Sequence, residues 1–274
     1  YVDYRLPQEG DIMITRKLIA CFDIRDGMVT KAHKFQDNID ILPAAEMARR
    51  MQADKIDGIV LYDIFASAEK RMIDLDPIRR VASEIDVPFT VGGGIRSIED
   101  MHAVLEAGAD KISIDSMAVR NPDLIEQAAK EFGSHSIVLS IQVKRVPFSN
   151  KIPSGYEVYI DSARHATGLD AVLWAKRGEE LGAGEIVVNS IDMDGTHQGF
   201  ELQITRAISE AVGVPIVASG GAGKPSHLVD VFLQTDAEYA IISSMLYSPR
   251  LPRNYTVKEL KEALTKAGIA VEPW

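Results

Sequence analysis

The chain contains one glycine-rich segment twice. Val87–Gly94 reads VPFTVGGG, and Val214–Gly221 reads VPIVASGG. Two further segments align with the same spacing, the second after one inserted residue: Asp63 with Ser190, and Asp115-Ser116-Met117 with Ser243-Ser244-Met245. A repeat of this kind indicates two related halves, each with a glycine turn at the end of one strand and a turn of small residues at the end of the next.

Turns of this composition can bind phosphate. Glycine lets the backbone approach a ligand and point amide groups at it, and the following helix start adds the positive end of its dipole. Two such turns around one opening would hold a substrate with a phosphate at each end. The alternative is that the glycines only permit tight turns, but the repetition in register favours phosphate binding. The candidate binding residues are Asp63, Gly93, Gly94, Asp115, Ser116, Ser190, Gly220, Gly221, Ser243 and Ser244.

The elements that would position these turns are short β-rich runs alternating with amphipathic segments. Helices are predicted at 44–52, 98–106, 122–132 and 169–181, with capping patterns such as Ser97 before Asp100 and Thr256 before Glu259. Strands that alternate with helices pair in parallel, and eight such units close most simply into a (β/α)₈ barrel of the α/β class. A doubly wound open sheet is the alternative. The eight predicted strands are 18–23, 59–63, 88–91, 111–115, 137–142, 185–190, 215–219 and 239–243.

Two long loops interrupt the alternation of strands and helices. One follows the first strand, at 25–42, and the other follows the fifth, at 146–167, where residues 155–160 suggest a small hairpin. In such barrels the loops after strands carry the chemistry. Residues 1–12 are interpreted as an N-terminal extension, and residues 13–274 as a single barrel domain.

Composition excludes several classes of function. Forty acidic against thirty basic side chains give a net charge of −10, and no basic block is long enough for nucleic acid. No apolar run is long enough for a membrane span, and Cys21 is the only cysteine, so we expect a cytoplasmic protein without disulfides. The six histidines show no metal-ligand spacing. No metal or cofactor is therefore expected, and Cys21 is interpreted as a buried apolar residue.

Further short motifs are distributed from about Met13 to Val271. They are Cys21–Asp23, Val91–Ser97, Gly108–Lys111, Ala118–Pro122, Gly168–Ala171, Gly182–Ile186, Asp192–Thr196 and Ser219–Gly223. Together they resemble the cyclase subunit family of imidazole glycerol phosphate synthase. The related isomerase of histidine biosynthesis shares the half-barrel repeat, but the motifs Gly-Ala-Gly-Glu-Ile and Ser-Gly-Gly-Ala-Gly are closer to the cyclase.

The resemblance implies a lyase-type ring closure. Ammonia released from glutamine by a partner glutaminase, bound as a heterodimer, would pass through the barrel. It would attack a bisphosphorylated ribulosyl formimino carboxamide ribonucleotide and yield imidazole glycerol phosphate and an aminoimidazole carboxamide ribonucleotide. A substrate with two phosphates agrees with the duplicated glycine turns.

The resemblance also implies roles for particular residues. Asp23, at the end of the first strand, would be the main acid and base, because a partly desolvated carboxylate at the mouth can shuttle protons. Lys31 would approach the substrate from the following loop, and Asp194 and Gly195 would belong to the substrate site. For Asp23 and Lys31 the alternatives are an aspartate that only binds its own loop and a solvated lysine.

At the opposite end of the barrel, the family has a ring of four charges that gates ammonia entry. Alternation along the first strand places Lys17 on the same side as Asp23, roughly 20 Å below it. Lys111 and Glu185 also begin strands, so these three residues are the candidate gate, although charges at strand starts can be simply solvated. Gly58 replaces the fourth charge, and neighbouring Asp57 could take it over.

Two substitutions depart from the family at the mouth. Gln142 stands where the family has its second catalytic aspartate, and an amide cannot titrate. Asp115 stands where the family has a phosphate-contacting asparagine, and a carboxylate repels phosphate. Two alternatives to the histidine-pathway cyclase therefore remain: a divergent paralogue that passes ammonia from a glutaminase to another biosynthetic enzyme, and a catalytically silent regulatory barrel.

Overall fold

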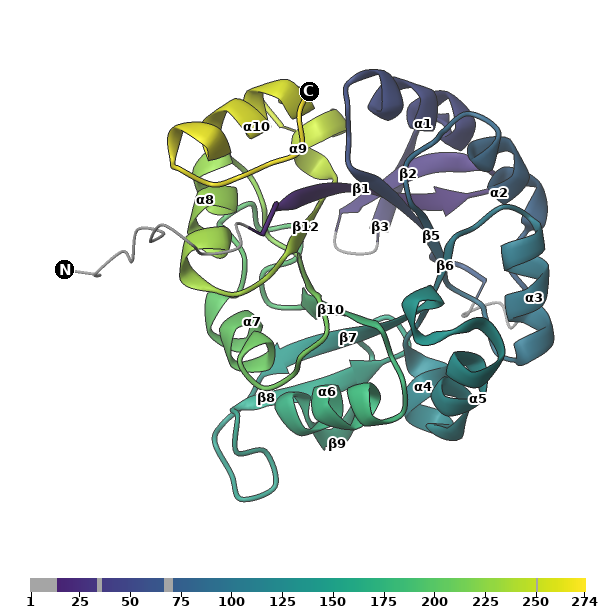
Figure 1. Cartoon of the computed structure of the whole chain (residues 1–274), viewed down its shortest axis with the longest axis vertical. Coiled ribbons are helices and arrows are strands. Elements are labelled where there is room, and N and C mark those ends of the chain that lie inside the picture. The colour runs from purple at the N-terminus through teal and green to yellow at the C-terminus, as the bar shows by residue number, and fades with distance from the viewer. Residues whose placement is uncertain (1–13, 34–35, 67–70, 250) are drawn as a thin grey trace.

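Eight parallel strands close into a barrel in the computed structural model, which describes residues 14–33, 36–66, 71–249 and 251–274. Each strand pairs with the next, and β12 and β1 complete the ring (Figure 1). This confirms the predicted (β/α)₈ barrel and excludes the open sheet; the interpretation of residues 1–12 lies outside the described residues. In ring order the strands are β1 (Lys17–Arg25), β4 (Gly58–Asp63), β5 (Phe89–Gly92), β6 (Lys111–Ile114), β7 (Ile137–Arg145), β10 (Glu185–Ser190), β11 (Ile216–Ser219) and β12 (Tyr239–Ile242).

Side chains alternate between the barrel interior and the helical layer. A compact interior cluster contains Cys21, Val60, Val138, Val187, Val217 and Ile241, with Ile19 packed against it. Leu18, Ala20 and Phe22 belong instead to the large core between strands and helices. Because successive side chains of a strand face opposite sides, Asp23 shares the interior side with Ile19 and Cys21, as predicted.

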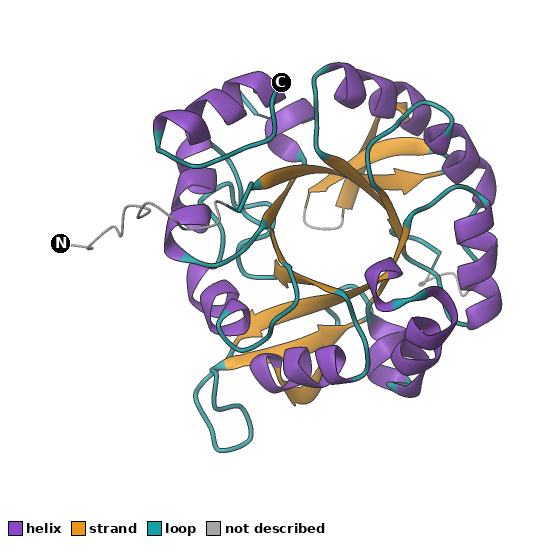
Figure 2. Cartoon of the chain, viewed as in Figure 1, coloured by secondary structure: helices purple, strands orange, loops and turns teal. Residues whose placement is uncertain are grey.

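The helices form the outer ring of the barrel (Figure 2). Two predicted starts are confirmed: the Ser97 side chain accepts a hydrogen bond from the Asp100 amide, and Thr256 and Glu259 form a capping box. No helix in the described part of the chain is long and apolar enough to cross a membrane. The helices are α1 (Ala44–Ala53), α2 (Leu75–Ala82), α3 (Ile98–Glu106), α4 (Ser116–Arg120), α5 (Asp123–Phe132), the 3₁₀ turn η1 (Ser134–Ser136), α6 (Ala171–Glu180), α7 (Leu202–Ser209), α8 (Pro225–Gln234), α9 (Ser244–Tyr247) and α10 (Val257–Lys266).

Both long loops fold as antiparallel hairpins. The first consists of β2 (Met28–His33) and β3 (Gln36–Pro43), and the second of β8 (Tyr156–Ile160) and β9 (His165–Asp170). The second was predicted from residues 155–160. Its strand β9 includes residues 169 and 170, so α6 begins later than predicted.

Candidate active site

The predicted catalytic residues meet at one end of the barrel. Asp23 lies near the end of β1, Asp115 directly follows β6, and Gln142 lies near the end of β7. The glycine turns follow β5 and β11. Because all eight strands are parallel, their carboxyl ends surround a single mouth. The Asp23 side chain is 28% exposed there, so a ligand can reach it.

Asp23 is held by a lysine from the first hairpin. The Lys31 ammonium lies 2.9 Å from Asp23 Oδ2, and β2 carries Lys31 back over the mouth because it pairs with β1. Burial is the largest influence and lowers the pKa of Lys31, but the charge and hydrogen bond of Asp23, together with Tyr247 and Cys21, raise that pKa above its usual range. Lys31 therefore stays an ammonium group beside the carboxylate.

A second carboxylate, Asp194, faces this pair from the loop after β10. Desolvation by the surrounding protein and then the charge of Asp23 raise the pKa of Asp194, whereas Lys31 lowers it. The neighbouring Gly195 has a φ of +70°. The structure thus brings three predicted site residues, Asp23, Lys31 and Asp194, within electrostatic reach of one another.

The two glycine turns have the same backbone conformation. Gly93 and Gly220 both have a φ of +89°, which L side chains rarely adopt. A Cβ on Gly93 would lie 2.4 Å from the Asp63 carbonyl oxygen, and one on Gly220 would lie 2.9 Å from that of Ser190. In each half, therefore, the preceding strand-to-helix loop approaches the turn too closely for any other residue.

The turns of small residues are equivalent as well. Asp115 has φ −128° and ψ −92°, and Ser243 has φ −142° and ψ −69°. Within the described part of the chain, four residues of the second half donate no backbone hydrogen bond outside their own helix: Gly221, Ala222, Ser244 and Met245. This corner, made by the turns after β11 and β12, has uncommitted donors and no carboxylate on either turn, which suits an anionic ligand.

Three predicted phosphate-binding residues make hydrogen bonds within the protein. Asp63 is 4% exposed, accepts hydrogen bonds from the amides of Phe65 and Ala66, and pairs with Arg71 at 2.7 Å. The Ser190 hydroxyl accepts a hydrogen bond from the Met193 amide. Ser116 accepts one from the Asp161 amide and so holds the second hairpin. These contacts position the turns around the mouth. A serine hydroxyl that accepts one hydrogen bond can still donate its own O–H, so ligand contact by the two serines stays a prediction.

The predicted gate residues lie at the opposite end, in two separate pairs. Lys111 and Glu185 form an ion pair at 2.5 Å, beside a recess of about 490 Å³ that Tyr239 also lines. Lys17 faces Glu272, 3.5 Å away, at the chain's C-terminal segment. The ring of charges expected from the sequence is therefore reduced to one pair across the floor of the barrel.

Asp57 does not take over the missing gate charge. It forms an ion pair with Lys261 of α10 at 2.5 Å, and its second oxygen accepts a hydrogen bond from the Leu18 amide. Its side chain is 5% exposed, that of Lys261 1%. The expectation was wrong because Asp57 precedes β4 and faces the helical layer, where the lysine neutralises it.

Two tyrosines near the site were not singled out from the sequence. Tyr62 projects into the barrel interior, where its hydroxyl lies 3.2 Å from Ser113 Oγ. Tyr247 donates a hydrogen bond to the Cys21 carbonyl, and its ring centroid is 5.8 Å from the Lys31 ammonium. Alternation along β4 would have placed Tyr62 inside. Nothing in the local sequence indicates that Tyr247 of α9 reaches β1.

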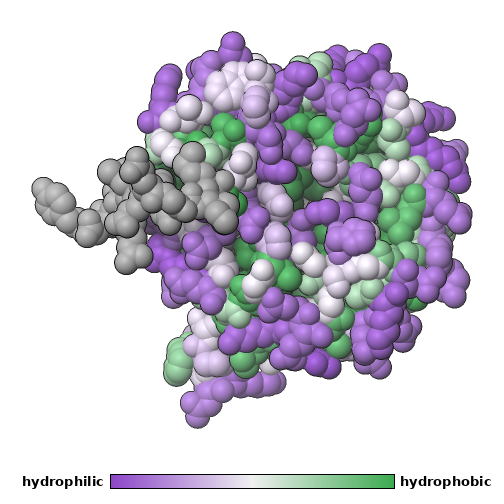
Figure 3. Space-filling model, viewed as in Figure 1, coloured by the Kyte–Doolittle hydropathy of each residue, from purple (hydrophilic) through white to green (hydrophobic). Residues whose placement is uncertain are grey.

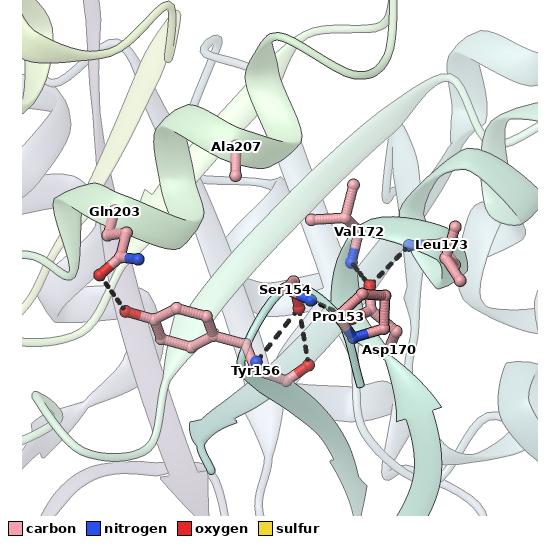
Figure 4. A pocket seen from close by; sticks show the side chains of 8 residues that line it. All are labelled: Pro153, Ser154, Tyr156, Asp170, Val172, Leu173, Gln203 and Ala207. Carbon is pink, nitrogen blue, oxygen red and sulfur yellow. Dashed lines mark hydrogen bonds between the residues drawn. The ribbon is translucent and has the colours of Figure 1, made fainter. Parts of the chain in front are cut away.

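A smaller recess of about 280 Å³ lies outside the mouth, between α6, α7 and the second hairpin (Figure 4). Its polar groups bind one another. The Tyr156 hydroxyl donates to Gln203, and Asp170 accepts hydrogen bonds from the amides of Ser154, Val172 and Leu173. This recess is a feature of helix packing.

Among the described residues, no cluster of three histidine, cysteine or acidic side chains could hold a metal ion.

Fold and site define a class: a (β/α)₈ barrel of two equivalent halves with an aspartate–lysine pair between two glycine turns. Residues 17–252 match the family model described as histidine biosynthesis protein. The chain belongs to that family. It is 50% identical to the imidazole glycerol phosphate synthase subunit HisF of Syntrophobacter fumaroxidans and to that of Desulfatibacillum aliphaticivorans, and 49% identical to that of Solidesulfovibrio magneticus. Each match covers 94% of this chain and 98% of the relative.

Proposed function

We propose that this chain is the cyclase subunit of an imidazole glycerol phosphate synthase. It uses ammonia from a partner glutaminase to close the imidazole ring and to cleave the bisphosphorylated formimino carboxamide ribonucleotide. One observation carries the proposal: the Asp23–Lys31 pair lies on a mouth that it shares with the glycine turns of both half-barrels. The similarity to HisF subunits over nearly the whole chain supports it.

In this proposal two kinds of group act at the mouth: backbone amides bind the phosphates, and charged side chains take part in the ring closure. The free amides after β11 and β12 bind one terminal phosphate, and the turn after β5 receives the other. Asp23 takes up and returns protons during ring closure, and Lys31 neutralises its charge and approaches the substrate. Such a positioned proton carrier typically contributes 10²–10⁴-fold to a rate.

The partner is proposed to dock at the opposite end of the barrel. Ammonia would enter beside the Lys111–Glu185 pair and travel through the interior, past Cys21 and Val60, to the mouth. Figure 3 shows one face of the molecule. Hydrophilic side chains cover much of the outer edge of this face, and hydrophobic residues lie between them.

The test is a steady-state assay with the bisphosphorylated substrate and ammonium chloride in place of the glutaminase. The wild-type chain is expected to release imidazole glycerol phosphate, and Asp23→Asn to lower kcat by about 100-fold or more. Asp26→Asn is the matched control, since it makes the same change at an exposed hairpin position three residues away. A wild-type chain that forms no product with ammonium would reject the proposed function.

A further inference from the structure

The mouth holds a carboxylate and an amide in direct contact, on neighbouring strands. Gln142 Nε2 donates a hydrogen bond to Asp115 Oδ2 over 3.3 Å. Asp115 directly follows β6 and Gln142 lies in β7, two strands that pair in parallel. The family resemblance puts the carboxylate at the position of Gln142 and the amide at that of Asp115. In this chain the same two chemical groups are present with their positions exchanged.

Asp115, like Asp194, has no ion-pair partner among the described residues, in contrast to three other aspartates near the mouth. Asp23 pairs with Lys31, Asp63 with Arg71, and Asp161 with Arg120. Within the described residues no ion pair includes Asp115. Its side chain meets only the neutral groups of Gln142 and Ser116, with the Asp161 carboxylate further off.

The surroundings of Asp115 favour its protonated form. Burial raises the pKa of Asp115, and the charge of Asp161 adds to this, whereas hydrogen bonds from Ser116 and Gln142 lower it. Tyr62 is the other titratable group facing it, from β4, and burial keeps that hydroxyl protonated by raising its pKa above the usual range. A carboxyl group whose pKa is raised keeps its proton to a higher pH and can then donate it to a substrate.

The position is unsuited to the phosphate contact expected from the repeat. Asp115 has the backbone conformation of Ser243, but its carboxylate would repel a phosphate at the first-half turn unless it were protonated. It also makes no side-chain capping bond to α4. Neither phosphate binding nor helix capping accounts for an aspartate at this place.

We infer that Asp115 is the second proton-transferring group of the mouth, and that Gln142 is the residue that positions it. The inference rests on the proposed function. Addition of ammonia to the keto carbon of the ribulosyl group forms a C–N bond and turns the carbonyl oxygen into a hydroxyl. Asp115 gives that oxygen its proton, and Asp23 takes the proton that the nitrogen loses. When the hydroxyl leaves as water, Asp23 protonates it and Asp115 recovers a proton from nitrogen, so both groups are reset.

The experiment compares full-length variants in the ammonium-dependent assay. Asp115→Asn is expected to lower kcat by about 100-fold with little change in KM. The double variant Asp115→Asn/Gln142→Asp, which returns the carboxylate to β7, should recover to within about tenfold of wild type. Asp123→Asn, an exposed aspartate on α5, is the matched control and should leave kcat unchanged.

A pH profile separates proton transfer from a structural role. In the wild type kcat should fall as pH rises through the pKa of Asp115, because only the acid form donates; Asp115→Asn should lack this limb. Asp115→Glu keeps the acid and should retain more activity than Asp115→Asn. An inactive wild type would overturn the proposed function and this inference with it. An active wild type whose Asp115→Asn variant stays within threefold in kcat would overturn the inference alone.

Discussion

Two aspartates on the same mouth have different partners, and the partners decide their chemistry. Asp23 has an ammonium group at 2.9 Å, and Asp115 has an amide at 3.3 Å. An ammonium neutralises the charge of a carboxylate, whereas an amide supplies one hydrogen bond and leaves the charge. The charge of Asp23 is therefore neutralised by Lys31, whereas burial raises the pKa of Asp115 and favours its proton-carrying form.

Tyr62 occupies interior space that a glycine leaves open. A Cβ on Gly92 would lie 2.7 Å from the Tyr62 ring and 2.9 Å from the Ser113 carbonyl oxygen. Gly92→Ala should therefore lower the free energy of unfolding by about 1–3 kcal/mol, the usual cost of overpacking. Urea denaturation followed by circular dichroism measures this change.

Two further variants check the cause of that loss. The double variant Gly92→Ala/Tyr62→Leu should lose less than the sum of its single variants, because the smaller side chain gives the new methyl group room. Gly213→Ala is a control at an exposed glycine whose nearest neighbour is a glutamate side chain at 3.4 Å. Additive losses in the double variant would show that the Ser113 backbone, and not the Tyr62 ring, limits the space.

At the scale of elements, α10 is attached to the barrel by buried charge. The Lys261 side chain is 1% exposed, and its ammonium contacts Asp57 and the Lys55 carbonyl. The Asp54 side chain accepts a hydrogen bond from the Val257 amide at the start of the same helix. The last helix therefore closes the ring against the segment that precedes β4.

Removing one charge of the Asp57–Lys261 pair should lower the free energy of unfolding more than removing both charges. Lys261→Met leaves a buried carboxylate without its cation, and such a loss costs about 3–5 kcal/mol. Asp57→Asn/Lys261→Met removes both charges and should be the more stable of the two. Thermal unfolding at neutral pH distinguishes them. A double variant less stable than Lys261→Met would mean that the Asp57 bond to the Leu18 amide matters more than the ion pair.

The sequence predicted all eight barrel strands but missed the first hairpin. Its signal is short: Asp26 and Gly27 link β1 to β2 with φ values of 50° and 75°, the two positive angles of a type I′ turn. Asp-Gly is a common pair for that turn. The strands it joins lie in a loop where neither barrel periodicity nor helix periodicity applies. This hairpin carries Lys31 to the mouth, so missing it also concealed how the lysine reaches Asp23.

On the scale of the whole molecule, the repeat predicted two equivalent glycine turns but not how the two halves differ. Gly93 and Gly220 were expected to be equivalent and have the same φ of +89°. The repeat also aligned Asp63 with Ser190, and both side chains accept hydrogen bonds from amides of the loops that follow them. Alignment could not show these contacts, because they depend on how each loop folds back on the end of its strand.

The twofold repeat allows the effect of a carboxylate on phosphate binding to be compared between two equivalent corners, one after β5 and β6 and one after β11 and β12. The second-half corner has Ser243 and free amides, whereas the first has Asp115 in the same conformation. Once the pH exceeds the pKa of Asp115 and its carboxyl is charged, inorganic phosphate should therefore bind the second corner more tightly, and Asp115→Ser should tighten binding at the first by roughly tenfold, equivalent to about 1.4 kcal/mol. The mirror variant Ser243→Asp should weaken binding at the second corner by a similar factor. Phosphate titrations followed by nuclear magnetic resonance of the amides at Gly94 and Gly221 report each corner separately. If the two corners bind equally in the wild type at every pH and neither exchange changes its corner, the backbone amides alone determine phosphate affinity.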